Sequence, residues 1–142
     1  MERILLVHPN AIAADELAFV LQHSGFQVAT ADDEHQALTE ISRKEPDVII
    51  MAEALAKQNG DEPCIRLRER CKASIIILGQ HREEGVGIHF LNSGADAYIP
   101  SPLNLRLLLA RIHSLIRCYA VKSGDRLHSI RESGVLHQEV TK

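Results

Sequence analysis

The chain has 142 residues, of which 45% are hydrophobic and 25% are charged. This length fits one domain with a sizeable core, and the composition is that of an ordinary globular protein. No apolar run approaches the roughly 20 residues of a membrane span, and the formal net charge of −3 argues against nucleic-acid binding by this chain alone. Because residues 1–7 begin as a strand and not as an export signal, we expect a cytoplasmic protein.

The first third of the chain alternates strand and helix patterns. Residues 4–7 form a continuous apolar run, as expected for a strand covered on both faces, and residues 26–30 predict a second strand. The first helix, which Gly25 ends, is predicted from apolar residues at helical spacing, namely Ala14, Leu17, Ala18 and Leu21. Asp33 and Gln36 resemble a capping box, and the helix after them has an apolar face of Ala37, Leu38 and Ile41.

The alternation continues to residue 118. Further strands are predicted at 47–51, 74–78 and 97–99. A loop with the turn signal Asn59-Gly60 spans 52–61, and the third helix after it is marked by Cys64, Leu67 and Cys71. A fourth helix fits 83–93, before Gly94. The buried stripe of a fifth helix is predicted to consist of Leu105, Leu108, Leu109, Ile112, Leu115 and Ile116.

Five strands alternating with five helices imply an α/β fold of the flavodoxin-like type. It would be a doubly wound, five-stranded parallel sheet between two layers of helices. In such sheets the functional crevice lies beyond the carboxyl ends of the strands. The residues predicted to lie there are His8, Thr30, Ala52, Glu53, Gly79, Gln80, Pro100 and Ser101.

The domain is predicted to span residues 1–118, and the remaining 119–142 differ in character. This tail is polar, carries charges of both signs and contains Gly124 and Gly134. We interpret it as a helical extension or linker, possibly leading to an effector domain, with a possible strand at 135–140. A disordered end is the alternative.

Cysteine and histidine patterns indicate neither a disulfide framework nor a zinc site. The three cysteines, Cys64, Cys71 and Cys118, are few and scattered, which favours reduced, buried or half-buried thiols. None of the eight histidines forms a zinc-type spacing beside them. We therefore expect no metal and no cofactor.

Four motifs, taken in order, resemble the receiver domain of bacterial response regulators. They are the strand 46–51, the turn 59–60, the segment 94–102 and the last helix, 108–117. The resemblance runs from Glu2 to Arg117 and is strongest to the OmpR/PhoB subfamily, whose receivers are linked to winged-helix DNA-binding domains. It implies the CheY-like fold and a role in two-component signal transduction. It also implies that Ser101-Pro102 is a cis peptide.

The chemistry of that family is missing from this sequence. The family has an acidic pair that holds Mg²⁺ where this chain has His8 and Pro9. Where the family has its phosphoacceptor Asp, this chain has Ala52. The family's hydroxyl residue is replaced by Gly79 and its Lys by Ser101. An alanine methyl cannot replace a carboxylate nucleophile. We therefore expect a phosphorylation-independent pseudo-receiver that is not an enzyme and that regulates transcription or another effector through protein contacts.

The residues of the crevice admit three other interpretations. Glu53 as a shifted phosphoacceptor is disfavoured, because a shift of one residue along a strand points a side chain to the opposite face. His8, Glu53 and Ser101 together would suit a hydrolase, but Ser101 has no Gly-x-Ser-x-Gly elbow and stands between two prolines, so this is the least favoured function. A ligand-sensing domain that binds a small metabolite in the crevice is the alternative to signalling by contacts alone.

Tyr98 matches the aromatic switch position of the resembling family. There the ring turns inward when the hydroxyl after the fourth strand is drawn to the phosphoryl group. Because Gly79 has no side chain to compete for that space, we predict that Tyr98 lies inward without phosphorylation. The alternative is an ordinary half-buried tyrosine.

The resemblance also implies a homodimer through the fourth helix, fifth strand and fifth helix. The residues assigned to this interface are Asp96, Leu107, Arg111, Ser114 and Cys118. The family's charged residues have become Ala97, Leu107 and Cys118, so we expect an interface that is more apolar than usual. A monomer with one exposed Leu is the alternative.

Overall fold

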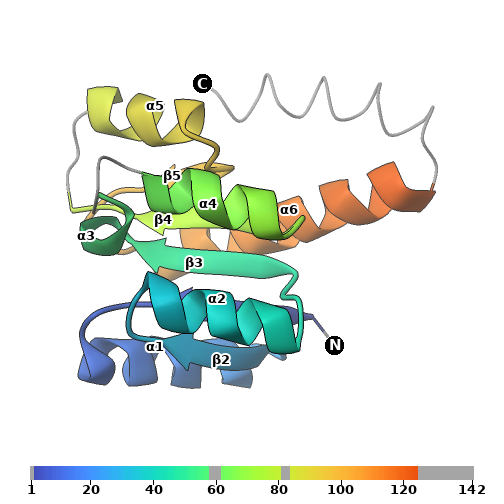
Figure 1. Ribbon diagram of the computed structural model, residues 1–142. Helices are drawn as coiled ribbons and strands as arrows, with labels where there is room; N and C mark the ends of the chain where they lie inside the picture. The colour runs from blue at the N-terminus through green and yellow to red at the C-terminus, as the bar shows by residue number, and fades with distance from the viewer. Residues whose placement is uncertain (1, 58–61, 81–83, 125–142) are drawn as a thin grey trace.

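The computed structural model describes residues 2–57, 62–80 and 84–124. Their five strands form one parallel sheet in the order β2-β1-β3-β4-β5 (Figure 1). The strands are β1 (Arg3–Val7), β2 (Gln27–Ala31), β3 (Val48–Ala52), β4 (Ser74–Leu78) and β5 (Ala97–Ile99). The helices are α1 (Ala11–His23), α2 (Glu34–Arg43), α3 (Glu53–Ala56), α4 (Glu62–Arg70), α5 (Glu84–Asn92) and α6 (Leu105–Gly124). This is the doubly wound, flavodoxin-like fold that the sequence predicted.

Both faces of the central strands are buried, which explains their continuous apolar sequences. All five residues of β3 are buried, as are the three isoleucines of β4, Ile75 to Ile77. One core lies between the sheet and helices α2, α3, α4 and α5, and a second lies between the sheet and helices α1 and α6. The chain therefore has three layers, with β2 and β5 as the edge strands.

Short-range hydrogen bonds set where the helices begin and end. The Asn10 side chain accepts from the backbone N–H groups of Ile12 and Ala13 at 3.0 and 3.1 Å, which caps α1. Asp33 caps α2 as predicted, since its carboxylate accepts from the Gln36 N–H at 2.9 Å, whereas the Gln36 side chain accepts from the Asp32 N–H at 2.8 Å instead of that of Asp33. After α5, Gly94 adopts a φ of +115°, a conformation that other residues rarely take.

The loop predicted over 52–61 is wrong in its first half. Ala52 is the last residue of β3, and α3 follows it directly, so the described residues contain six helices. Leu55 and Ala56 are buried in the core, which gives this single turn its apolar contacts. The predicted third, fourth and fifth helices are therefore α4, α5 and α6. The predicted turn at 59–60 lies outside the described residues.

The stripe predicted for the last helix is also wrong at its first residue. Leu105 is 37% exposed because it lies in the first turn of α6, beyond the end of β5 at Ile99. Burial begins at Leu108 and Ile112, which are both fully enclosed. The helix continues to Gly124, as expected for a helical extension, whereas the possible strand at 135–140 lies outside the described residues.

The remaining expectations that concern packing agree with the structure. Cys64 and Cys71 are buried and Cys118 is half-buried, all as free thiols. Burial raises the pKa of the Cys71 thiol, which keeps it protonated and unreactive at neutral pH. No helix in the described part of the chain is both long and apolar enough to cross a membrane.

Replacing Asn10 by Ala removes the acceptor that caps α1. We expect the free energy of unfolding to fall by about 1 kcal/mol, as is typical for the loss of such a cap. Urea denaturation followed by circular dichroism measures this change. Asn10→Asp keeps an acceptor oxygen and should stay within about 0.5 kcal/mol of wild type; equal losses in the two variants would contradict the capping role.

Candidate functional site

The carboxyl ends of four strands meet at one edge of the sheet. The pairing places Val7 beside Met51, Met51 beside Ile77, and Ile77 beside Tyr98. His8, Ala52 and Gly79 follow in the chain directly after or close to these residues, so they gather at this edge. In Figure 1 the strand arrows point toward it, and α3 lies beside it. This is the edge of the sheet that the topology predicted to be functional.

A buried carboxylate stands at the centre of this edge. Glu53, the first residue of α3, has 0% exposure. Its Oε1 accepts hydrogen bonds from the Tyr98 hydroxyl at 2.6 Å and from the Gln80 backbone N–H at 2.7 Å. Its Oε2 lies 2.9 Å from the Lys57 ammonium. These partners stabilise a charge that would otherwise be costly to remove from water.

The Tyr98 ring occupies the space that Gly79 leaves open. A Cβ built on Gly79 would lie 2.2 Å from both Cζ and Oη of Tyr98, far closer than two such atoms can approach. On α5, a Cβ on Gly87 would lie 3.2 Å from the ring, and the Phe90 ring stacks against Tyr98 with centroids 5.8 Å apart. The half-buried ring therefore lies between the end of β4 and α5. Its function as a switch remains a prediction.

The positions that correspond to the family's metal site carry no carboxylate. His8 accepts a hydrogen bond at Nδ1 from the Asn10 N–H at 3.0 Å. Partial burial lowers the pKa of His8 from its ordinary value of 6.5, so the ring is neutral at pH 7. Pro9 beside it is exposed and offers no ligand atom in its side chain. A neutral imidazole next to a proline does not supply the oxygen ligands that Mg²⁺ prefers.

The other positions that correspond to the family's phosphorylation site lie at the same edge. Ala52 ends β3 and is 7% exposed, with a methyl group where an acceptor carboxylate would be needed. Ser101 is exposed, two residues beyond β5, and the Ser101–Pro102 peptide is cis, as predicted. Glu53 is too deeply buried to meet a phosphodonor in this conformation, which agrees with its rejection as a shifted acceptor.

The hydrolase interpretation finds no support in these contacts. Both carboxylate oxygens of Glu53 are engaged by Tyr98, Gln80 and Lys57, so Glu53 does not orient His8 as a base. Within the described residues, no group of three His, Cys, Asp or Glu side chains could hold a metal ion.

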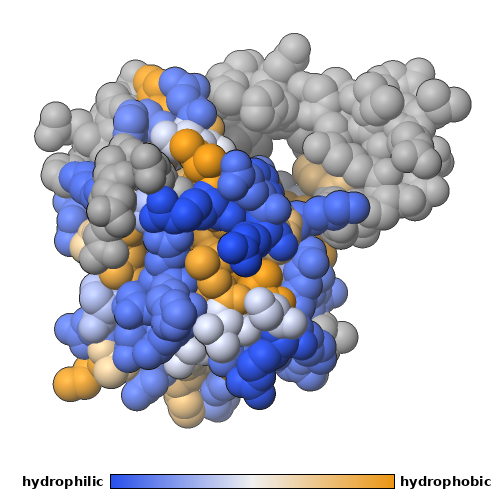
Figure 2. Space-filling model, viewed as in Figure 1, coloured by the Kyte–Doolittle hydropathy of each residue, from blue (hydrophilic) through white to orange (hydrophobic). Residues whose placement is uncertain are grey.

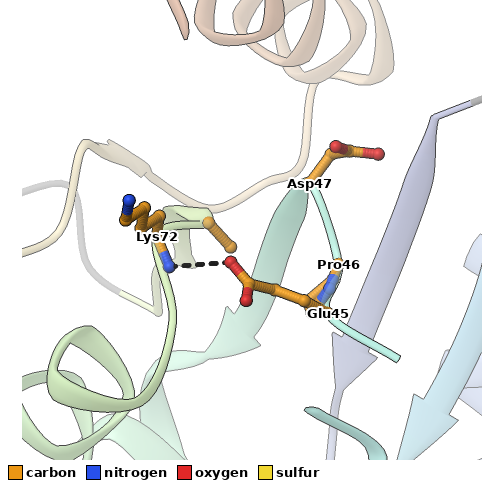
Figure 3. A pocket seen from close by; sticks show the side chains of 5 residues that line it. Glu45, Pro46, Asp47 and Lys72 are labelled. Atoms are coloured by element: carbon orange, nitrogen blue, oxygen red, sulfur yellow. Dashed lines mark hydrogen bonds between the residues drawn. The ribbon is translucent and has the colours of Figure 1, made fainter. Parts of the chain in front are cut away.

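A surface depression of about 170 Å³ lies at the opposite edge of the sheet, before β3 and β4. Figure 3 shows Glu45 and Lys72 on its two sides, where the Lys72 N–H donates to the Glu45 carboxylate at 3.1 Å. Asp47 is also engaged, because it accepts from the Arg3 N–H at 2.8 Å. The carboxylates of Glu45 and Asp47 are both hydrogen-bonded within the chain, and the depression lies away from the functional edge, so we assign it no ligand.

The residues predicted for a dimer interface lie around the edge strand β5. Leu107 on α6 is 38% exposed, and Arg111, Ser114 and Cys118 are half-buried on the same helix. Asp96 is used within the chain: its Oδ2 accepts from the Arg68 guanidinium at 2.6 Å and from the Ile75 N–H at 2.8 Å. Helices α5 and α6 flank β5 from opposite faces of the sheet, as their two separate cores show.

Three participants in the site were not identified from the sequence. They are Lys57, Gly87 and the Gln80 backbone N–H. The spacing of Glu53 and Lys57, four residues apart, is a signal that could have indicated the ion pair once a helix was expected there. The contact between Glu53 and Tyr98 joins residues 45 apart in the chain, and no local pattern indicates it.

Residues 4–113 match the family described as the response regulator receiver domain. Because this match covers most of the chain, the chain belongs to that family. A crystal structure of a two-component response regulator from Clostridium difficile superposes with a TM-score of 0.76 at 25% identity, covering 82% of this chain and 97% of that one.

Two mycobacterial proteins are among its relatives, which are response regulators of the OmpR/PhoB type. The sensory transduction protein RegX3 of Mycobacterium tuberculosis is 29% identical over all 142 residues, which is 63% of its own length. The DNA-binding response regulator MtrA of Mycobacterium leprae is 34% identical over 116 residues, which are 82% of this chain and 52% of the relative. The chain therefore spans between half and two thirds of the length of these relatives.

Replacing Gly79 by Ala should force the Tyr98 ring out of its present place. The added methyl would overlap the ring, and overpacking of this kind costs about 1–3 kcal/mol of unfolding free energy. Urea denaturation measures the cost. Gly87→Ala is the matched control: it adds the same methyl at a less crowded point, and the better helix propensity of Ala offsets part of its cost. If the two variants are equally stable, the close contact between Gly79 and the ring is wrong.

Proposed function

We propose that this chain is a pseudo-receiver, a receiver domain of an atypical response regulator that signals without phosphorylation. The observation that carries the proposal is the Ala52 methyl at the end of β3, where a nucleophilic carboxylate would be required to form an aspartyl phosphate. The neutral His8 and the adjacent Pro9 support it, because they are unsuited to Mg²⁺. The domain acts through protein contacts and has no enzymatic role.

The inward position of Tyr98 supports a constitutive signalling state. In the resembling family this ring turns inward as a consequence of phosphorylation, whereas here Gly79 leaves the space open in the unmodified chain. Two-state signalling domains respond to whatever biases the two states. A chain whose sequence itself favours one state needs no phosphoryl group to reach it.

Beryllofluoride with Mg²⁺, a mimic of the bound phosphoryl group, should leave the amide NMR spectrum of this protein unchanged. The reason is that Ala52 offers no oxygen to bond the mimic, and His8 and Pro9 offer no site for its metal. A receiver with an intact acidic site, measured in the same buffer, serves as the positive control. Specific shifts around Ala52 and Ser101 would show that a phosphoryl site survives and would refute the proposal.

The proposed signalling contact is a homodimer through the α5–β5–α6 face, which comprises the exposed apolar residues Ile88 and Leu91 on α5 and Leu107 on α6. Their exposed fractions are 50%, 44% and 38%. Hydrophobic atoms are visible over α5 in Figure 2, and other hydrophobic atoms lie at the centre of the same view. Apolar side chains gathered on both sides of an edge strand are typical of a surface that another protein covers.

The balance of energies favours an apolar interface over an ionic one. Exposed ion pairs contribute about 0–1 kcal/mol each, so a dimer that lacks the family's charges at Ala97, Leu107 and Cys118 loses little affinity. Burial of a Leu side chain contributes about 1.5–3 kcal/mol, and a two-fold axis buries it twice. Asp96 is already paired with Arg68 in its own chain, which also reduces the ionic share.

Leu107→Asp should convert a micromolar dimer into a monomer, because two carboxylates would face each other across the two-fold axis. Light scattering after size exclusion measures the mass of each form. The wild-type dimer should persist in high salt, since few of its contacts are ionic. Leu103→Asp, an exposed Leu outside the face defined above, is the control and should remain dimeric. A monomeric wild type, or a dimeric Leu107→Asp, would show that this interface is wrong.

We infer that an effector domain follows residues 119–142. The RegX3 alignment extends through the whole tail and not only through the receiver match at 4–113. RegX3 and MtrA are both longer than the aligned part, and the name of MtrA describes it as DNA-binding. Any DNA contact would then belong to the effector domain, consistent with the net charge of −3 on this chain. The coding sequence downstream of Lys142 provides the test.

A further inference from the structure

Within the described residues, Glu53 is the one charged side chain that is fully buried. It does not belong to the set of positions that the family uses for phosphorylation, and the proposed function does not require it. A buried charge that serves no purpose is usually replaced at little cost by an apolar residue. Its presence at the functional edge of the sheet therefore calls for an explanation.

The contacts of Glu53 come from three different parts of the edge. The Tyr98 hydroxyl belongs to β5, the Gln80 N–H belongs to the segment after β4, and the Lys57 ammonium follows α3. Two of these hydrogen bonds end on the same oxygen, Oε1. Hydrogen bonds to an ionised acceptor are shorter and stronger than those between neutral groups, and the 2.6 Å between the Tyr98 hydroxyl and Glu53 is the usual length of such a bond.

We propose that Glu53 is a positioning residue that holds the Tyr98 ring inward and thereby fixes the surface of α5. The carboxylate supplies a fixed acceptor oxygen at the edge of the sheet, one residue beyond the position where the family would carry a phosphoryl group. It draws the phenol hydroxyl directly, without a hydroxyl at position 79 as an intermediate. The inference rests on the proposed phosphorylation-independent function and names the group that replaces the phosphoryl signal.

The ring connects the carboxylate to the partner-facing helix. On one side Tyr98 donates to Glu53, and on the other it lies against Gly87 and stacks on the fully buried Phe90 of α5. The rings of Phe90 and Tyr98 are nearly parallel, with an interplanar angle of 8°. Ile88 and Leu91, which belong to the α5–β5–α6 face, flank Phe90 in the same helix. A shift of the Tyr98 ring would therefore change the packing of Phe90, and through it the position of α5 and of its exposed residues.

Lys57 has a separate part in this arrangement. Its ammonium pairs with Oε2, the oxygen that Tyr98 does not use, so the two contacts do not compete. The pair joins residues four apart across the single turn of α3, with Lys57 47% exposed and Glu53 fully enclosed. Lys57 thus neutralises the buried charge from the solvent side while the phenol binds it from within.

The test is NMR spectroscopy of the chain with variants that remove the acceptor, the donor or only the charge. In wild type we expect nuclear Overhauser contacts between the Tyr98 ring protons and the Gly79 α protons, because these groups touch. Glu53→Leu keeps the approximate size but removes both acceptor oxygens, and it should abolish these contacts and shift the amides of Gly87, Ile88 and Leu91. Glu53→Gln keeps an acceptor oxygen and should retain the contacts.

Two further variants separate a positioning role from a loss of stability. Glu34→Gln weakens the ion pair between α2 and Arg66 of α4 on the same face of the sheet. It should leave the contacts of Tyr98 unchanged even if it lowers stability. Tyr98→Phe removes only the donor, and it tests the same contact should Glu53→Leu not fold. It should shift the same α5 amides, and the Glu53→Leu, Tyr98→Phe double variant should shift them no further than the larger single change.

The proposal is overturned if Glu53→Leu keeps the contacts between Tyr98 and Gly79, or if it loses them while the α5 amides stay in place. Additive shifts in the double variant would also overturn it, because the two residues would then act independently. These results are distinguishable from a failure of the proposed function. That failure would appear as a response of the wild-type chain to beryllofluoride, or as a monomeric wild type, and neither measurement depends on Glu53.

Discussion

The buried carboxylate of Glu53 needs hydrogen-bond donors, and the segments at the functional edge are arranged to supply them. A charge fully removed from water is tolerated only where several donors converge on it, and here they come from β5, from the chain after β4 and from α3. The parallel sheet makes this convergence possible, because its register aligns the carboxyl ends of β3, β4 and β5. The buried apolar strands therefore provide the scaffold, and the carboxylate determines how the segments beyond the strands are arranged on it.

Two glycines belong to the same arrangement. Tyr98 can reach Glu53 only because Gly79 leaves the space that its ring occupies, and α5 can lie close to the ring because Gly87 has no side chain. Neither glycine has a positive φ, so backbone conformation does not explain them. Their common property is the space that they give to one aromatic ring. This links the loss of the family's hydroxyl at position 79 to the gain of a direct contact between Tyr98 and Glu53.

The sequence was most informative where many residues repeat one pattern. Strand runs such as Ile75 to Ile77 and the capping residue Asp33 led to the correct fold, because burial on both faces and local hydrogen bonds act over a few neighbouring positions. Helix α3 was not predicted, because a segment of four residues is too short to show the periodicity of a helix. Leu105 fits the apolar spacing of α6 but lies beyond the sheet, which periodicity alone cannot reveal.

The sequence shows which residues of the family's site are missing, but it does not show which residues contact one another at the site. Each missing family residue can be identified from its position after a strand, as at Ala52 and Ser101, and the space at Gly79 suggested the inward ring. The partner of that ring was not predictable in the same way, because Glu53 and Tyr98 are 45 residues apart and only the fold brings them together. The sequence places a carboxylate beside Ala52, and only the structure shows that it accepts hydrogen bonds from Tyr98 and Gln80.

These interactions imply that no single substitution would give this edge the phosphorylation chemistry of the family. A carboxylate at position 52 would still lack the oxygen ligands for Mg²⁺ that His8 and Pro9 do not provide, and it would stand beside the existing charge of Glu53. A hydroxyl side chain at position 79 would collide with the ring of Tyr98, whose present place depends on the absence of that side chain. The Tyr98 ring uses the space at Gly79 and its hydroxyl bonds to Glu53, so these three residues depend on one another as a set. Such dependence supports the proposal that Glu53 and Tyr98 form a fixed pair in a domain that signals without phosphorylation.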